Sequence, residues 1–279
     1  MPGPLFTDIR RFDTIDSTNR YLLEEARAGA PEGVVVVAGH QSAGRGRLGR
    51  RWEAPAGANL LVSVLLRPNL PADRRHLAAA VVAIAAAEAV EDLADLRLGM
   101  KWPNDLLAPD GRKVAGVLAE GDLAANPSAP GRTGRGSGPA TSGHPDTPNP
   151  PIVVGIGINV NWPATDRDLP GELVGTATSL RQLTGRYFEP TEVLDALLRA
   201  LEPRLSALGT PSGRARQADE LRSRCVTLGT EVRIELAGSR FVGRAVDITA
   251  EGHLVVETSG GPRTVVAGDV VHVRVPRPG

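Results

Sequence analysis

The amino-acid sequence predicts an α+β protein in which a β-sheet flanked by helices precedes a small C-terminal β-barrel. Three observations support this prediction. Strand-like and helix-like segments alternate over the first 120 residues or so, a stretch nearly without large apolar residues follows the alternating part, and five short strand-like segments occupy the end of the chain.

The first part of the chain contains five predicted strands and two predicted helices. The strands are expected at residues 12–15, 34–38, 59–66, 96–102 and 114–120, and the last two flank a Pro-Asn-Asp turn. The helices are expected at residues 20–28 and 74–93. Ser17, Thr18 and Asn19 are candidate N-caps of the first helix, which ends at Gly29. The second helix is rich in Ala, Val and Leu, so we expect it to be largely buried.

A compositional break separates this part from the rest of the chain. Residues 124–151 include 18 Gly, Pro, Ser or Thr residues and lack Val, Leu, Ile and aromatic residues. Such a segment buries too little apolar surface to offset the entropy of ordering it. We therefore predict a disordered insertion within a hairpin formed by strands at 114–120 and 152–159.

The C-terminal part begins with two helices and continues with strands. The helices are expected at residues 191–208, with Thr191 as a possible cap, and near 213–224. The strands are expected at residues 231–236, 241–248, 254–258, 263–266 and 270–275. Short strands at this regular spacing indicate a small barrel, so we expect two domains, 1–225 and 226–279.

The overall composition excludes several classes of protein. The 279 residues carry 32 Lys and Arg against 32 Asp and Glu, which argues against bulk electrostatic binding of nucleic acid. The single cysteine, Cys225, cannot form an internal disulfide. The sequence contains neither an apolar run long enough to span a membrane nor a signal peptide. We expect a cytoplasmic protein.

A glycine- and arginine-rich segment after the second predicted strand is the most informative part of the sequence. It contains Gly44-x-Gly46-x-x-Gly49, but no good helix follows, so a dinucleotide-binding turn is a weak interpretation. Its four arginines are Arg45, Arg47, Arg50 and Arg51. Such a loop would be ordered by an anion, and Trp52 could stack on a base. The pattern favours a nucleotide as ligand; the alternative is a solvated basic loop, which could bind RNA.

Two weaker clusters lie elsewhere. Lys101 closes a predicted strand, where it could project into a crevice or remain a surface charge. Gly155 and Gly157 interrupt an apolar strand, which indicates close approach of a ligand or close packing of a helix. The histidines and Cys225 show no metal-ligand spacing, and no Ser-His-Asp arrangement can be argued.

Taken together, these clusters resemble the biotin–protein ligase family. The matching motifs, in order, are Ser17-Thr18-Asn19, Gln41 with the loop from Gly44 to Trp52, Lys101-Trp-Pro-Asn-Asp105, Lys113-Val-Ala-Gly116-Val-Leu-Ala-Glu120 and Gly155-x-Gly157-x-Asn159. Each of the three tryptophans, Trp52, Trp102 and Trp162, lies in or beside one of these motifs. We therefore expect indole rings to be concentrated around the ligand.

The resemblance implies a fold and an activity. The fold would be a mixed β-sheet flanked by helices, of the class II aminoacyl-tRNA synthetase-like type, followed by an SH3-like barrel. The enzyme would convert biotin and ATP to biotinyl-5′-AMP and then transfer biotin to a lysine of the biotin carboxyl carrier domain of an acyl-CoA carboxylase. Ser17 lies close to the N-terminus, so we expect a monofunctional ligase without the DNA-binding domain of some members.

The resemblance also implies roles for individual residues. Lys101 and Arg47 would be catalytic, acting on the biotin carboxylate and the phosphates. The biotin-binding residues would be Ser17, Thr18, Asn19, Gln41, Gly44, Arg45, Gly46, Arg47, Lys101, Gly116, Gly155 and Gly157. The ATP and adenylate site would comprise Arg47, Arg50, Trp52, Asn104, Lys113 and Asn159, with Trp52 covering the adenine. Mg²⁺ is implied by ATP, but the sequence does not indicate its ligands.

Two alternatives remain at this stage. A lipoate- or octanoate-protein ligase would use the same adenylation chemistry on a related fold. A non-catalytic nucleotide- or RNA-binding module would use the basic loop alone. Whether the protein is a monomer or a homodimer is left open.

Overall fold

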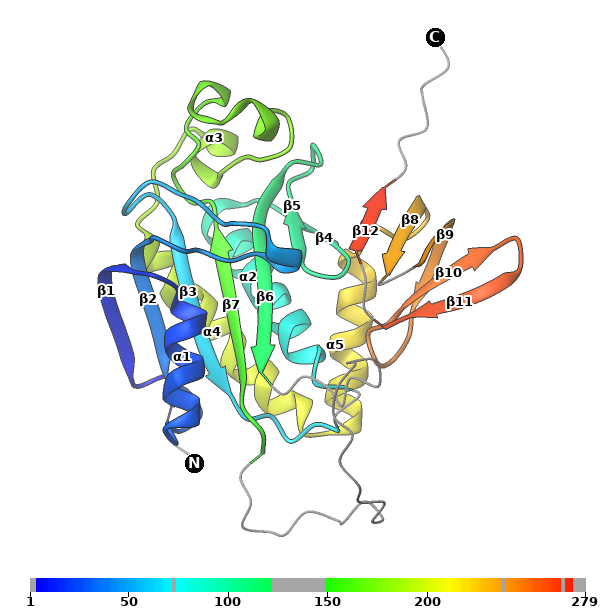
Figure 1. Ribbon diagram of the computed structural model, residues 1–279, viewed down its shortest axis with the longest axis horizontal. Coiled ribbons are helices and arrows are strands. Elements are labelled where there is room, and N and C mark those ends of the chain that lie inside the picture. Colours follow the sequence, from blue (N-terminus) through cyan, green and yellow to red (C-terminus); the bar gives the residue numbers. More distant parts are fainter. Residues whose placement is uncertain (1–3, 72–73, 122–148, 237–238, 267–268, 273–279) are drawn as a thin grey trace.

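A seven-stranded mixed β-sheet forms the centre of the molecule, and a five-stranded antiparallel sheet lies beside it (Figure 1). The computed structural model describes residues 4–71, 74–121, 149–236, 239–266 and 269–272. The large sheet has the order β1-β2-β3-β7-β6-β5-β4, in which β1 pairs parallel to β2 and all other neighbours pair antiparallel. The predicted mixed sheet with flanking helices is therefore confirmed.

The elements follow the predicted order, with shifted bounds. The large sheet contains β1 (Ile9–Ile15), β2 (Val35–Gln41), β3 (Leu60–Leu66), β4 (Gly99–Lys101), β5 (Asp105–Leu107), β6 (Lys113–Gly121) and β7 (Ile152–Ile158). The helices are α1 (Thr18–Arg27), α2 (Leu77–Ala94), α3 (Leu180–Thr184), α4 (Pro190–Leu208) and α5 (Pro211–Arg224). Short 3-10 turns in the described ranges include η1 (Arg47–Gly49), η3 (Asp166–Asp168) and η4 (Gly171–Leu173).

Three details differ from the sequence-based expectation. The predicted Pro-Asn-Asp turn ends in the three-residue strand β5, which pairs with β4 and β6. Helix α3 spans five residues, too few for a periodic signal. Thr191 does not cap α4, because the helix already begins at Pro190 with Glu189 as N-cap. Proline suits the first helical position because its missing N–H would have no partner there.

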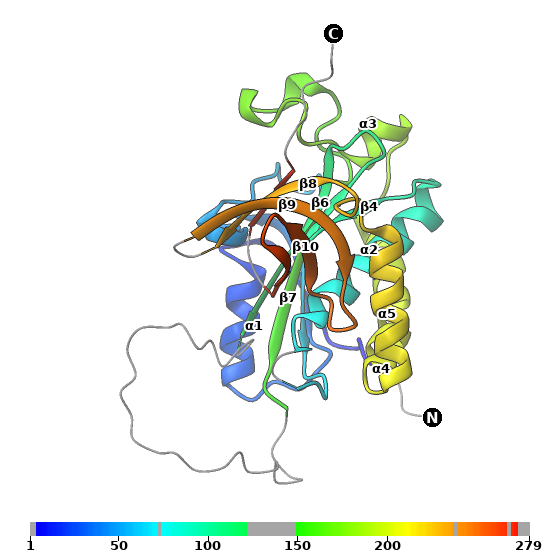
Figure 2. The same cartoon turned by 90° about the vertical axis from the view of Figure 1, so that its right-hand side faces the viewer.

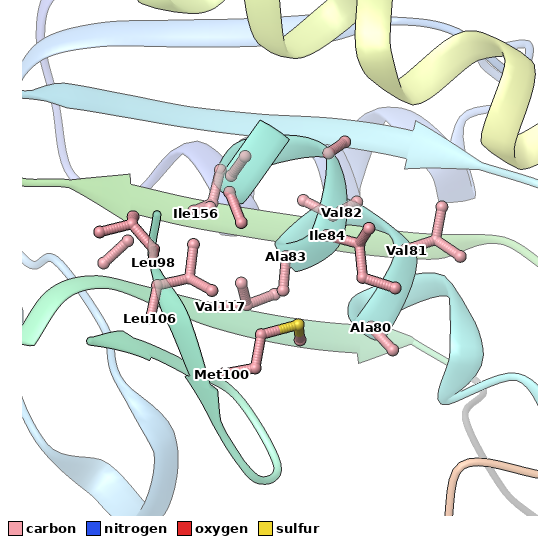
Figure 3. Packing of buried hydrophobic residues seen from close by; sticks show 14 of the residues in the cluster. Ala80, Val81, Val82, Ala83, Ile84, Leu98, Met100, Leu106, Val117 and Ile156 are labelled. Atoms are coloured by element: carbon pink, nitrogen blue, oxygen red, sulfur yellow. The ribbon is translucent and has the colours of Figure 1, made fainter. Parts of the chain in front are cut away.

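The two faces of the large sheet are covered by different helices. The long helix α2 and its neighbour α4 pack on one face and α1 packs on the other. Figure 3 shows side chains of α2, among them Ala83 and Ile84, beside apolar side chains of the strands, including Val117 and Ile156. Because side chains alternate along a strand, Val62 and Val64 join this core whereas Leu65 packs under α1.

On the sheet face that packs against α1, large apolar residues give way to small residues towards one end of the sheet. Val153 on β7 packs with α1, but the following positions on that side are Gly155 and Gly157. Ser63 on β3 faces the same side and is fully buried. The segment after β2, drawn in blue in Figure 1, crosses β7 and β6 at this end. Small residues therefore leave room between the sheet and this segment.

The second sheet contains five antiparallel strands in the order β11-β10-β9-β8-β12. They are β8 (Glu231–Leu236), β9 (Ser239–Ile248), β10 (Leu254–Thr258), β11 (Gly261–Val265) and β12 (Asp269–His272). Figure 2 shows this sheet beside α5 and β4. An ion pair of 2.7 Å joins Arg222 of α5 to Asp247 of β9. The predicted strands 231–236 and 254–258 match β8 and β10 residue for residue.

The predicted hairpin around the insertion is confirmed at its base. Strands β6 and β7 pair antiparallel, with Gly121 opposite Ile152. Most of the predicted insertion at 124–151 lies outside the described residues. Asn149, which lies near its end, exchanges hydrogen bonds with Arg67 at 3.2 and 3.3 Å. Within the described parts of the chain, no helix is both long and apolar enough to cross a membrane.

Candidate functional site

A cavity of about 360 Å³ lies between the large sheet and the segment that follows β2. The predicted site residues that line it are Ser17, Thr18, Asn19, Gln41, Arg45, Gly46, Arg47, Arg50, Trp52, Lys101, Asn104, Lys113, Gly116, Gly155, Gly157 and Asn159. Gly44 is the one predicted residue outside this lining. Five motifs that are far apart in the sequence therefore meet in one cavity of a size typical of small-molecule sites.

One end of the cavity is polar and is built from the start of α1 and the end of β2. Ser17 caps α1 by accepting a hydrogen bond from the Arg20 N–H at 3.4 Å. Gln41 Oε1 accepts hydrogen bonds from the Thr18 N–H at 2.8 Å and from the Thr18 hydroxyl at 3.0 Å. Ser17 and Thr18 are both buried. The motif therefore caps the helix, as the sequence predicts, and also lines the cavity.

The glycine–arginine loop forms a short hairpin over the cavity. Its ends are joined by a hydrogen bond of 3.0 Å from the Trp52 N–H to the Gly44 carbonyl and one of 2.7 Å from the Gly46 N–H to the Arg50 carbonyl. A Cβ atom on Gly44 would overlap the Trp52 carbonyl, so only glycine fits there. At the tip, Leu48 adopts a positive φ of 56° and is 70% exposed. A dinucleotide-binding turn is excluded, since the motif ends in the single 3-10 turn η1 and does not lead into a helix.

The indole of Trp52 lies across two glycines of the sheet. A Cβ atom on Gly157 would lie 2.7 Å from Trp52 Cζ2, and one on Gly116 would lie 3.1 Å from Cζ3. The Lys113 ammonium lies 5.3 Å from the centre of the ring, within the range of a cation–π interaction. The sequence predicts that another group closely approaches the glycines of β7, and in the structure that group is the indole of Trp52. The indole N–H is buried and has no hydrogen-bond partner among the residues that the structure describes.

The opposite end of the cavity carries Lys101, Asn104 and Lys113. Asn104 Oδ1 accepts a hydrogen bond of 3.0 Å from Arg47, and its amide donates one of 3.0 Å to the Val117 carbonyl. Lys113 is paired with Asp105 at 2.7 Å. The Lys101 ammonium forms no hydrogen bond or ion pair with the residues that the structure describes, although it lines the cavity. A half-buried cation without a protein partner is suited to an anionic ligand.

A buried asparagine network supports the end of β7. Asn59 Oδ1 accepts hydrogen bonds from the N–H groups of Val160, Asn161 and Trp162 at 3.0, 3.3 and 3.1 Å. Its amide donates to Asn159 Oδ1 at 3.3 Å. Asn159 is therefore held by protein contacts at the edge of the cavity.

Charges around the cavity are unevenly compensated. Arg45 is paired with Glu120 and Lys113 with Asp105. Lys101 has no such carboxylate among the described residues, so positive charge prevails at its end of the cavity. No three His, Cys, Asp or Glu side chains cluster within the described ranges.

The three tryptophans, Trp52, Trp102 and Trp162, all line the cavity, and Trp102 is in addition tied to the C-terminal part. Its indole N–H donates a hydrogen bond of 3.0 Å to the Gly252 carbonyl, and its backbone N–H donates one of 3.0 Å to Thr227 Oγ1. Trp102 is therefore buried between the two sheets.

Sequence reasoning also missed four polar residues that hold the site together. They are Asn59, Ser63, Asp105 and Glu120. Ser63 could have been identified from the sequence, because it is the single polar residue in the apolar run of β3. A buried hydroxyl needs hydrogen-bond partners, and its partners here are the residues of the first motif.

Comparison with known proteins identifies relatives over most of the chain. Residues 11–127 match the biotin/lipoate A/B protein ligase family and residues 227–273 match the biotin protein ligase C-terminal domain. The biotin–[acetyl-CoA-carboxylase] ligase of Mycobacterium tuberculosis is 35% identical over 264 residues, which cover 92% of this chain and 86% of the relative. The bifunctional ligase/repressor BirA of Bacillus subtilis is 31% identical over 92% of this chain and 72% of its own length.

A solved structure agrees with these matches. The biotin protein ligase from Aquifex aeolicus in complex with biotin and ATP superposes with a TM-score of 0.75 at 28% identity. The superposition covers 97% of this chain and all of that protein.

Proposed function

The chain belongs to the biotin protein ligase family, and we propose that its cavity binds biotin and ATP side by side and joins them. The observation that carries this proposal is that the polar end at Ser17, Thr18 and Gln41 meets, in one cavity, the Lys101 ammonium, which has no ion-pair partner in the described part of the chain. The polar end would hold the ring end of biotin. The cationic end would hold the biotin carboxylate and the phosphates.

The reaction proceeds in two steps. In the first, the biotin carboxylate attacks the α-phosphorus of ATP, a carboxyl–phosphate bond forms, and pyrophosphate leaves. In the second, a lysine amine of a biotin carboxyl carrier domain attacks the carbonyl carbon, AMP leaves, and the amine loses a proton. The carrier domain of an acyl-CoA carboxylase is the acceptor that we propose.

We propose that Lys101 and Arg47 are the catalytic residues of the first step. Two anions must approach, and negative charge accumulates on the phosphate oxygens in the transition state. Lys101, having no carboxylate partner among the described residues, can neutralise both anions. Arg47, positioned by Asn104 at 3.0 Å, would bind a phosphate group. Most of the catalytic effect would come from positioning and electrostatics.

We propose that the remaining residues divide between the two substrates. Asn19, Gly44, Arg45, Gly46, Gly116, Gly155 and Gly157 complete the biotin site. Arg50, Trp52, Asn104, Lys113 and Asn159 complete the nucleotide site, with the Trp52 indole packing on the adenine. Mg²⁺ usually binds through substrate phosphates with few protein ligands. It would therefore enter with ATP, where it supplies positive charge to the phosphates.

We also propose a division into two domains at residue 225. The described strands of the small sheet begin at Glu231, and the C-terminal family match begins at residue 227. An SH3-like barrel is the form we propose for this second domain. It packs on β4 through Trp102 and thereby supports the end of the strand that carries Lys101.

The experiment that tests this function is ATP–pyrophosphate exchange with biotin, with lipoate and with neither acid. We expect exchange that depends on biotin, followed by transfer to a purified carrier domain. The polar end of the cavity, with its hydroxyl and amide groups, suits a cyclic urea better than a dithiolane ring. Exchange with lipoate alone, or with neither acid, would refute the proposal.

A further inference from the structure

We infer that a buried hydrogen-bond chain from Glu120 through Asn19 and Ser63 to Thr18 fixes which atoms of the biotin pocket donate and which accept. This inference rests on the proposed function, because it assumes that the polar end of the cavity holds the ring end of biotin. It assigns Ser63 and Glu120 as positioning residues that select a cyclic urea, although neither lines the cavity.

The chain begins at the carboxylate of Glu120. The Asn19 amide nitrogen donates to Glu120 Oε2 at 2.9 Å and to the Leu118 carbonyl at 3.1 Å. Both partners are pure acceptors, so the nitrogen of Asn19 must face them. Its oxygen, Oδ1, must therefore face Ser63, whose hydroxyl lies 2.6 Å away. Glu120 is itself held by Arg45 through its other oxygen.

The hydroxyl protons then have one satisfactory arrangement. Ser63 Oγ lies 2.6 Å from Asn19 Oδ1 and 2.7 Å from Thr18 Oγ1, while Thr18 Oγ1 also lies 3.0 Å from Gln41 Oε1. Asn19 Oδ1 carries no proton, so Ser63 must donate to it. Ser63 also donates to Thr18 Oγ1, and the Thr18 hydroxyl in turn donates to Gln41 Oε1. Gln41 Oε1 accepts a second hydrogen bond from the Thr18 N–H at 2.8 Å.

This arrangement determines which hydrogen-bond donors and acceptors the cavity offers to a ligand. The Thr18 proton is directed at Gln41 Oε1, so the hydroxyl offers a lone pair to the cavity. The Gln41 oxygen is occupied by the Thr18 N–H, so its amide nitrogen is left as a donor. A cyclic urea presents N–H donors beside a carbonyl acceptor and therefore matches the pattern. A dithiolane ring presents neither group and would leave these polar atoms unpaired.

The chain is buried deeply enough for its polarity to matter. Ser63 is fully buried, and Thr18 and Asn19 are 4% exposed. A Cβ atom on Gly155 would overlap Asn19 Oδ1 and lie 3.1 Å from Ser63 Oγ, so the glycine makes room for the chain. In such surroundings water cannot replace a missing partner, and loss of one link leaves an unsatisfied group.

The experiment measures the KM for biotin, desthiobiotin and ATP in Ser63→Ala and Asn19→Asp, in the exchange assay. We expect Ser63→Ala to raise the KM of biotin about fivefold to thirtyfold, as expected for one buried hydrogen bond. Desthiobiotin retains the cyclic urea and should lose the same factor. The KM for ATP should stay within about twofold, which also shows that the variant is folded. Ser179→Ala, another fully buried serine with hydrogen bonds, is the matched control and should leave the biotin KM unchanged.

A double variant tests the polarity itself. Asn19→Asp places a second carboxylate against Glu120 and should weaken biotin binding more than Ser63→Ala. Adding Glu120→Gln supplies an amide donor to the introduced carboxylate and should restore part of the biotin affinity. An unchanged biotin KM in Ser63→Ala, or a double variant no better than Asn19→Asp, would overturn the inference. If the unsubstituted protein shows no biotin-dependent exchange, the proposed function fails instead.

Discussion

The packing of Trp52 on Gly157 predicts that one added methyl group will disturb the loop over the cavity. A Cβ atom at position 157 would lie 2.7 Å from Trp52 Cζ2 and from Nε1. Ordinary carbon contacts lie near 3.5–4.0 Å, so the ring must move by about 1 Å. The Trp52 N–H is hydrogen-bonded to Gly44 at 3.0 Å, so a displaced ring also displaces the base of the loop.

The size of the effect follows from the cost of overpacking. Inserting one methyl group into a close-packed site costs about 1–3 kcal/mol. If that energy comes from closing the loop, Gly157→Ala should lower kcat/KM for biotin about fivefold to 150-fold. The stability of the fold should change less, because the loop can lift away from the sheet. The tryptophan emission should shift as the buried indole becomes more exposed.

The assay combines steady-state exchange kinetics with fluorescence. Gly171→Ala is the matched control, since a Cβ atom there would have no neighbour within 4 Å. We expect this control to keep both the kinetics and the emission spectrum. If Gly157→Ala has the same kinetics and emission spectrum as the control, then the contact between Trp52 and Gly157 does not contribute to closing the loop, and the reasoning is wrong.

Four further predictions concern separate parts of the molecule. Lys101→Ala should abolish adenylate formation without lowering the melting temperature, because its ammonium has no protein partner within the described residues; retained activity in the exchange assay would contradict its role. Replacing residues 124–148 by a short turn should keep activity, since Gly121 and Ile152 already pair at the hairpin base; loss of biotinylation would refute this. Burial raises the pKa of the Cys225 thiol, so iodoacetamide at about pH 8 should label it slowly until the protein unfolds, and rapid labelling of the folded protein would contradict this. The hydrogen bond from Arg222 lowers the pKa of Asp247, so the stability it contributes is present above the unfolded pKa of about 4 and is lost as the pH falls through the folded value; Asp247→Asn should therefore flatten the loss of melting temperature in acid.

The sequence predicted the fold well where a pattern extends over many residues. The buried helix α2 and the strands β3 and β7 have long apolar signatures, and each was located to within a few residues. Strand β5 has three residues and begins with Asp105, a residue typical of turns, so local pattern could not reveal it. It exists because β4 and β6 provide partners on both sides.

The cavity lining was predictable because the motifs are local, whereas the contacts that orient the motifs are not. Ser63 lies 44 residues from Asn19 along the chain, and Glu120 lies 101 residues from it. Such pairs become visible only when β3, β6 and α1 are brought together. The same holds for Trp102, whose partner Gly252 is 150 residues away in the second sheet.

Two consecutive residues at the end of β4 have different structural roles. Lys101 faces the cavity, and Trp102 is anchored to Thr227 and Gly252 of the C-terminal part. A loosening of the small sheet would therefore be transmitted by a single peptide unit to the reactive ammonium group. For protein engineers, this makes the region around residue 225 a poor place to divide the enzyme into complementing fragments. Two such halves would regain chemistry only if they re-formed the indole anchor when they associated.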